Sequence, residues 1–310
     1  MKEENKKIAL SLGDVSWNNT LGIYYIDMRP SIIHYTDNIY DGKFDENGVP
    51  MINDGKGNLY YSPVNICQYS FIIHAKWLEK RNEKHEQILD ACMNILERIK
   101  TETKSTVCWI QNKYNKRYDI KAPWVGAMDQ GQALSFYIRY FQLTNNEYYL
   151  LQAEKIVAFF DLNVEDGGFK RIDKNGNLWY EEYPSSEPSY VLNGFIFALY
   201  GLIDFYRVTN DQKVKKTIDS CVSTITNNIH KYDSGYWSYY DQLKKELVRF
   251  YYQKNIHVPQ MKSLYILTNN KIFDKYAQKW EKNIKPINYI FVKLMYRILP
   301  RIRRLVLKFK

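Results

Sequence analysis

The stretch MDQGQALSFYIRYFQLTNNEYYLLQAEKIVAFFDL, residues 128–162, decides the fold. Apolar residues recur at helical spacing on both sides of the polar turn TNNE, which predicts helices over 128–143 and 147–162. Two helices joined by so short a turn form an αα-hairpin. This hairpin is the unit from which we expect most of the chain to be built.

The same helical period recurs along the chain after Pro63. It predicts further helices over 64–80, 83–104, 189–207, 211–230, 259–267 and 272–283. Long inserts fall at every second connection, and one of them carries Asn175-Gly176 between alternating segments, the pattern of a β-hairpin. We therefore expect a mainly α protein, an αα-hairpin toroid (α/α-barrel), with the inserts around a cleft at one end.

The chain divides into three parts by composition. Residues 16–62 are turn-rich and aromatic, and their Asp-Gly and Asn-Gly pairs predict a small β-rich or irregular segment. We expect this segment to span 1–62, the α/α-barrel 63–284 and a basic tail 285–310.

Composition excludes several classes of protein. The 310 residues are 45% apolar, which excludes wholesale disorder. The net charge is +10, but the tail from 285 to 310 holds eight Lys and Arg residues and no acid, so a general nucleic-acid-binding surface is not indicated. The N-terminal apolar stretch is too short for a signal peptide, and no run is long enough to span a membrane.

The sequence offers no cofactor or metal motif. Nucleotide-binding glycine motifs and zinc motifs are absent, and His34, His74, His85 and His230 lack ligand spacing. The cysteines, which form no CxxC pair, suit a reducing compartment. They are Cys67, Cys92, Cys108 and Cys221. We expect neither a cofactor nor a metal.

The inserts gather aromatic and polar side chains that suit sugar binding. A pyranose presents an apolar C–H face and a rim of hydroxyls, which aromatic rings and polar groups match. The alternative for any single ring is that it packs the core. The candidates are Trp179, Tyr180, Glu182, Tyr183, Asn193, Tyr232, Trp237, Tyr240, Arg249, Tyr252 and His257.

Three of these blocks resemble a known family. WVGAMDQGQALS (124–135), WYEEYPSSEPSYVLNGF (179–195) and YDSGYWSYYD (232–241) are similar to the C-terminal domain of D-glucuronyl C5-epimerases, and 48–69 is similar to the stretch before it. The resemblance covers roughly residues 20 to 284 and implies an α/α-barrel that inverts glucuronate to iduronate in a heparan-type polysaccharide. It also implies a homodimer.

The chemistry of that reaction matches the residues present. The C5 proton lies α to a carboxylate, so a base must remove it from one face, an acid must return one to the other, and donors must hold the carboxylate. The resemblance assigns Glu182, Tyr183 and Tyr240 to proton transfer, with Tyr252 or its neighbour Tyr251 as the third tyrosine.

The remaining candidates would bind substrate, and each keeps a structural alternative. Gln130 and Gln132 bind sugar hydroxyls or cap a helix, and Asn193 holds substrate or a loop backbone. His257 binds substrate or is a buried structural histidine. The other proposed contacts are Trp179, Tyr180, Trp237, Arg249 and Lys244, the last standing in for an arginine of the family without its bidentate fork.

Residues 286–309 alternate large apolar residues with Lys and Arg at roughly helical spacing. This pattern is typical of an interfacial helix on an anionic membrane, although a helix packed on the barrel with a solvated basic face is the alternative. We expect a cytoplasmic protein, peripheral at the inner face of the membrane. Two other functions share the cleft: a uronate polysaccharide lyase and a non-catalytic glycan-binding barrel.

Overall fold

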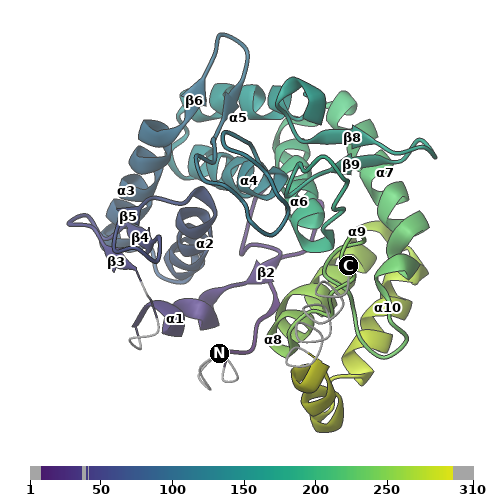
Figure 1. Cartoon of the computed structure of the whole chain (residues 1–310). Coiled ribbons are helices and arrows are strands. Elements are labelled where there is room, and N and C mark those ends of the chain that lie inside the picture. The colour runs from purple at the N-terminus through teal and green to yellow at the C-terminus, as the bar shows by residue number, and fades with distance from the viewer. Residues whose placement is uncertain (1–7, 37–39, 41, 296–310) are drawn as a thin grey trace.

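Figure 1 shows the computed structural model, which describes residues 8–36, 40 and 42–295. Each helical pair predicted from the sequence is present. The helices are α2 (Pro63–Glu79), α3 (Glu83–Ile99), α4 (Ala127–Thr144), α5 (Glu147–Phe159), α6 (Leu192–Thr209), α7 (Gln212–Asn228), α9 (Val258–Thr268) and α10 (Lys271–Lys282).

Several predicted helix bounds differ from those of the structure. The helix expected over 83–104 ends at Ile99, because β6 (Thr101–Glu102) turns back to pair with β7 (Val107–Cys108). The helix expected to begin at Ser189 begins at Leu192 instead, after Tyr190 adopts the left-handed conformation at φ 47°.

The helices form two layers of a ring (Figure 1). Helices α2, α4, α6 and α9 lie on the inside, and α3, α5, α7 and α10 lie outside them. Helix α6 is buried on all sides from Leu192 to Phe205, whereas α3, α7 and α10 bury one face only, as their sequence period requires. The α/α-barrel prediction is confirmed.

The N-terminal segment closes the ring. Strand β1 (Ser11–Leu12) pairs with β2 (Ile26–Asp27), and β2 and α1 (Ile32–Thr36) cross the gap between α2 and α8 (Phe250–Tyr252) in Figure 1. Tyr25 stacks on Tyr200 of α6, with ring centroids 4.2 Å apart. A second small sheet consists of β3 (Lys43–Phe44), β4 (Pro50–Asn53) and β5 (Leu59–Tyr60). Tyr25 and the helices belong to one hydrophobic core. The predicted division between a segment 1–62 and a barrel 63–284 therefore stays a prediction.

The long connections meet at one end of the ring. They precede α4, α6 and α9, and alternate with short turns such as 145–146 and 210–211. The Ala127 N–H donates to the Glu181 carbonyl (2.9 Å), and the Tyr118 hydroxyl donates to Asp241 Oδ2 (2.8 Å). The predicted β-hairpin is β8 (Lys170–Ile172) with β9 (Leu178–Tyr180), registered Lys170 to Tyr180. These contacts build the floor and walls of the candidate site.

A last helix covers 286–295 and packs by Val292 beside Trp237 and Val248. The predicted tail beyond 295 lies outside the described residues. Within the described part of the chain, no helix is long and apolar enough to cross a bilayer.

Candidate active site

Glu182 lies at the centre of a cluster of tyrosines. It is the second residue after β9, and its Oε1 accepts a hydrogen bond from the Tyr240 hydroxyl (3.0 Å). Its other oxygen lies against Gly194 at the start of α6, where a Cβ atom would come within 2.1 Å of Oε2. Glycine at this position therefore makes room for the carboxyl group.

Tyr183 and Tyr252 complete the cluster. The Tyr252 ring meets the Tyr240 ring edge-to-face, with centroids 5.7 Å apart, and the Tyr240 hydroxyl favours the charged form of Tyr252. Tyr183 stacks on Tyr118, with ring centroids 4.7 Å apart, and its hydroxyl favours the charged form of Glu182. The structure thus brings together Glu182, Tyr183, Tyr240 and Tyr252, while Tyr251 is bonded to Ser31 of the N-terminal segment instead.

Burial sets the protonation of this cluster. Removal from water raises the pKa of Glu182 to about 7, although the hydroxyls of Tyr183 and Tyr240 favour its charged form. The charge of Glu182, together with burial, raises the pKa of Tyr183 well above 10, and burial does the same for Tyr240 and Tyr252. Near neutral pH the site therefore holds neutral phenols beside a carboxyl group that is poised between its two forms.

A second buried carboxyl lies nearby. Asp129, in the first turn of α4, accepts from Gln111 Nε2 (3.1 Å), and burial raises its pKa to about 7. Its charge adds to the rise in the pKa of Glu182.

Arg117 is a site residue that the sequence reasoning missed. It lies on the insert between β7 and α4, and its guanidinium carbon is 4.7 Å from the centroid of the Tyr240 ring. Its Nη2 pairs with Asp241 (3.4 Å) and Glu246 (3.0 Å), and 42% of its side chain is exposed. The sequence shows only that Lys113, Lys116 and Arg117 make a basic run in an insert. It does not indicate that Arg117 contacts Tyr240, which is 123 residues away in the chain.

The cations expected from sequence lie elsewhere. The Lys244 ammonium donates to the Arg117 carbonyl and lies 5.3 Å from the Tyr118 ring. Arg249 is exposed at the start of α8. Lys244 therefore supports the loop that carries Arg117, and its expected role in substrate binding stays a prediction.

The buried amides have unused hydrogen-bonding capacity. Gln130 and Gln132 are fully buried inside α4, and their amide atoms have no partner among the described residues. They do not cap α4, whose N-cap is Gly126. Asn193 also leaves its Oδ1 unpaired within the described part of the chain, while its carbonyl accepts from Gln260. Buried amides need partners, so sugar hydroxyls or bound water would suit them.

Other predicted contact residues are packed into the walls. The Trp179 indole donates to Asp173 Oδ2 (3.1 Å), and the Trp237 indole donates to the Val248 carbonyl (2.7 Å). Tyr180 is buried among aromatic rings, including Phe160 at 5.0 Å. The burial of these three rings leaves little of their surface for a sugar. The sequence could not show this, because the same ring types occur in cores and in sugar sites.

His257 is also a wall residue. It is fully buried with its Nδ1 2.9 Å from the Ser238 hydroxyl, and burial lowers its pKa to about 3. It is therefore neutral and held by the loop. Among the described residues, no group of three acidic, histidine or cysteine side chains is placed to hold a metal ion.

Comparison with known proteins identifies the region that holds this cluster. Residues 102–282 match the family model described as D-glucuronyl C5-epimerase C-terminus. The chain belongs to this family. It is 34% identical over 179 residues to an uncharacterized protein of Methanocaldococcus jannaschii, covering 57% of this chain and 58% of that one. It is 28% identical over 222 residues to the D-glucuronyl C5-epimerase of Caenorhabditis elegans, covering 66% of this chain and 36% of that protein. The alignments thus span about half or less of these relatives' lengths.

Solved structures share the fold. A cellobiose 2-epimerase from Bacillus thermoamylovorans superposes with a TM-score of 0.53 at 13% identity, covering 77% of this chain and 65% of the other. An alpha-1,6-mannanase from Salegentibacter gives 0.51 at 13% identity (83% and 69%), and a D-mannose isomerase gives 0.53 at 10% (82% and 68%). At such identities the likeness establishes the α/α-barrel alone.

Proposed function

We propose that this protein is a carbohydrate epimerase that inverts C5 of D-glucuronate residues to L-iduronate in a polysaccharide. One observation carries the proposal: a buried carboxyl with a pKa of about 7 accepts a hydrogen bond from a neutral tyrosine, whose ring packs edge-to-face on that of a second tyrosine. That set contains a base and an acid of suitable strength.

The two ends of this set have different roles. The Glu182 carboxylate removes the C5 proton from one face of the sugar, and the Tyr252 hydroxyl donates a proton to C5 from the other face. Glu182 ends protonated and Tyr252 ends as phenolate. Tyr240 lies between them, so one proton passes from Glu182 to Tyr240 as another passes from Tyr240 to Tyr252, which restores the starting state.

Arg117 holds the substrate carboxylate. Removing the C5 proton places additional negative charge on the carboxylate oxygens, and a guanidinium offers a bidentate fork to them. The ion pairs of Arg117 with Asp241 and Glu246 are made by Nη2. Its charge also lowers the pKa of Tyr252, which favours the phenolate that the reaction creates.

The two rival functions make different products. A lyase removes the same proton and then expels the oxygen on C4, leaving a shorter chain with a double bond. A glycan-binding barrel changes nothing. Incubating glucuronate polymer with the protein in deuterated water separates them: deuterium at C5 in intact chains supports the epimerase, whereas ultraviolet-absorbing fragments or no change would refute it.

We also propose that the protein attaches to the inner face of an anionic membrane, as a peripheral protein on the cytoplasmic side. Helix 286–295 exposes Ile287, Ile290, Phe291 and Leu294, at 72%, 64%, 43% and 48%. These positions form one helical stripe, and the basic sequence that follows would favour anionic lipid. The homodimer implied by the resemblance stays a prediction for sedimentation analysis.

A further inference from the structure

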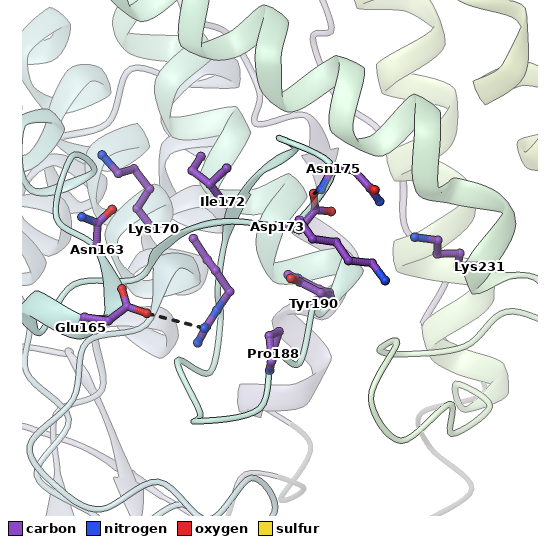
Figure 2. A pocket seen from close by; sticks show the side chains of 11 residues that line it. Asn163, Glu165, Lys170, Ile172, Asp173, Asn175, Pro188, Tyr190 and Lys231 are labelled. Carbon is purple, nitrogen blue, oxygen red and sulfur yellow. Dashed lines mark hydrogen bonds and ion pairs between the residues drawn. The ribbon is translucent and has the colours of Figure 1, made fainter.

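A pocket of about 590 Å³ lies beside the β8–β9 hairpin, a volume typical of small-molecule sites. Figure 2 shows side chains of the hairpin, of Pro188 and Tyr190 and of Lys231 around it. None of the residues assigned above to proton transfer or to substrate binding lines this pocket.

The pocket favours an anion. Four cations line it, Lys170, Arg171, Lys174 and Lys231, against two carboxylates. One of the carboxylates, Asp173, is occupied within the hairpin: it accepts from the backbone N–H groups of residues 175 and 177 and from the Trp179 indole.

The lysines are left for a ligand. Glu165, the other carboxylate, is 3.8 Å from Arg171 Nη1 (Figure 2). Lys231 donates to the Asn228 side chain, a neutral partner (2.6 Å), and Lys170 and Lys174 make no ion pair with a carboxylate of the described residues. Three ammonium groups from two segments of the chain therefore line the pocket without an ion-pair partner among the described residues.

The pocket also presents apolar surface of the kind that sugars use. The Tyr190 ring lines it, held on the buried Trp179 ring with centroids 4.4 Å apart. Ile172, also in the lining, is 55% exposed. A ring fixed in this way can accept the C–H face of a pyranose at low entropic cost.

The pocket and the proton-transfer cluster share one wall, the segment 181–190. Glu182 and Tyr183 belong to the cluster, whereas Pro188 and Tyr190 line the pocket. Buried Glu181 ties the segment together, because its Oε2 accepts from the Ser189 hydroxyl (2.7 Å) and from the Tyr190 N–H (3.0 Å). A bound chain passing along this wall would meet both sites.

We propose that this pocket is a second carbohydrate subsite, which holds an acidic sugar residue of the same polymer at a distance from the residue that reacts. The inference rests on the proposed function, since it takes the substrate to be a polysaccharide that contains uronate residues. It predicts that the protein prefers long chains over short ones.

The test is the double variant Lys174→Ala/Lys231→Ala, with Lys84→Ala/Lys216→Ala as control, since those exposed lysines lie on α3 and α7, outside the pocket lining. KM is measured by C5 deuterium incorporation with a glucuronate-containing tetrasaccharide and with long polymer. We expect KM for the polymer to rise about tenfold in the pocket variant, because each lysine contributes up to about 1 kcal/mol, and to stay as in the unmodified protein in the control. An unchanged ratio of polymer KM to tetrasaccharide KM overturns the subsite.

Calorimetric titration of polymer into the same proteins separates this inference from the proposed function. If the unmodified protein incorporates no deuterium, the proposed function fails, and the titration alone then tests the pocket. Weaker polymer binding in the pocket variant than in the control supports the subsite, and equal binding overturns it.

Discussion

At the scale of single residues, the account depends on which tyrosine hydroxyls move protons. Tyr240→Phe removes the hydroxyl that is bonded to Glu182, and Tyr252→Phe removes the hydroxyl of the ring that packs on Tyr240. We expect each to lower kcat/KM for C5 exchange by about 100-fold or more, the usual effect of losing an acid or base.

Tyr251→Phe is the matched control, because its hydroxyl is bonded to Ser31 and not to the cluster. It should keep activity within about twofold of the unmodified protein, since the hydroxyl that it removes lies outside the cluster. Equal losses in Tyr251→Phe and Tyr252→Phe would mean that the cluster has been assigned to the wrong tyrosine.

Arg117 gives a separate prediction, because it acts on the substrate carboxylate and not on the C5 proton. Arg117→Gln should lower kcat/KM by about 100-fold, and Arg117→Lys should recover only part of the loss, since an ammonium lacks the bidentate fork. Lys116→Gln, an exposed cation on the same loop, is the control. Full activity in Arg117→Gln would exclude this role.

Glu182 should make the protein less stable at high pH. Its folded pKa of about 7 lies above the ordinary value of 4.5, so ionisation opposes folding from about pH 4.5 upward, and the full cost is reached above pH 7. Glu182→Gln should therefore raise the free energy of unfolding by about 3 kcal/mol at pH 8 and by less than about 1 kcal/mol at pH 5.

Urea unfolding at the two pH values measures this difference, with the exposed Glu187→Gln as control. A Glu182→Gln variant less stable than the unmodified protein at pH 8 would show that the buried carboxylate is better compensated than the structure implies.

At the scale of elements, α4 and α6 approach each other through glycines. A Cβ atom at Gly131 would lie 2.3 Å from the Ala198 Cα, and one at Gly201 would lie 2.4 Å from the Gly131 carbonyl oxygen. Gly201→Ala should therefore lower the free energy of unfolding by about 1–3 kcal/mol through overpacking.

Thermal unfolding checks this prediction. The control is Gly48→Ala, where no atom lies within 4 Å but φ is +80°, so its cost comes from backbone strain alone. A Gly201→Ala variant that melts at the same temperature as the unmodified protein would mean that α4 and α6 can separate without cost.

The positions of the helices were the part of the structure that the sequence predicted best. Helical period located each hairpin, because a buried stripe fixes the spacing of apolar residues. The end of α3 was missed because the residues 101–102 bond to a strand that only the folded insert supplies. Glu182 and Tyr240 were found through their motifs, whereas Arg117 reaches Tyr240 only through tertiary folding. Trp179, Tyr180 and Trp237 are buried, and their contact with sugar stays a prediction, because composition cannot tell a packed ring from a sugar-binding ring.

At the scale of the whole molecule, the chain combines a ring that carries the site with a helix that exposes an apolar stripe. Deleting 286–310 removes Ile287, Ile290, Phe291 and Leu294 together with most of the net positive charge. We expect the truncated protein to lose binding to vesicles that contain anionic lipid, because both the buried apolar area and the charge attraction are lost.

Vesicle co-sedimentation measures the binding of the truncated protein to anionic lipid. C5 exchange on soluble polymer is the control, because it shows whether the barrel of the truncated protein is still folded. Truncated protein that still sediments with anionic vesicles would refute attachment through this segment.

The most direct test of the central claim is the fate of the C5 hydrogen. Glucuronate polymer is incubated with the protein in deuterated water, and the position of deuterium and the configuration at C5 are read by nuclear magnetic resonance. The account predicts deuterium at C5, a mixture of glucuronate and iduronate, and chains of unchanged length. Chains that are cleaved with a new double bond, or that carry no deuterium, would contradict it.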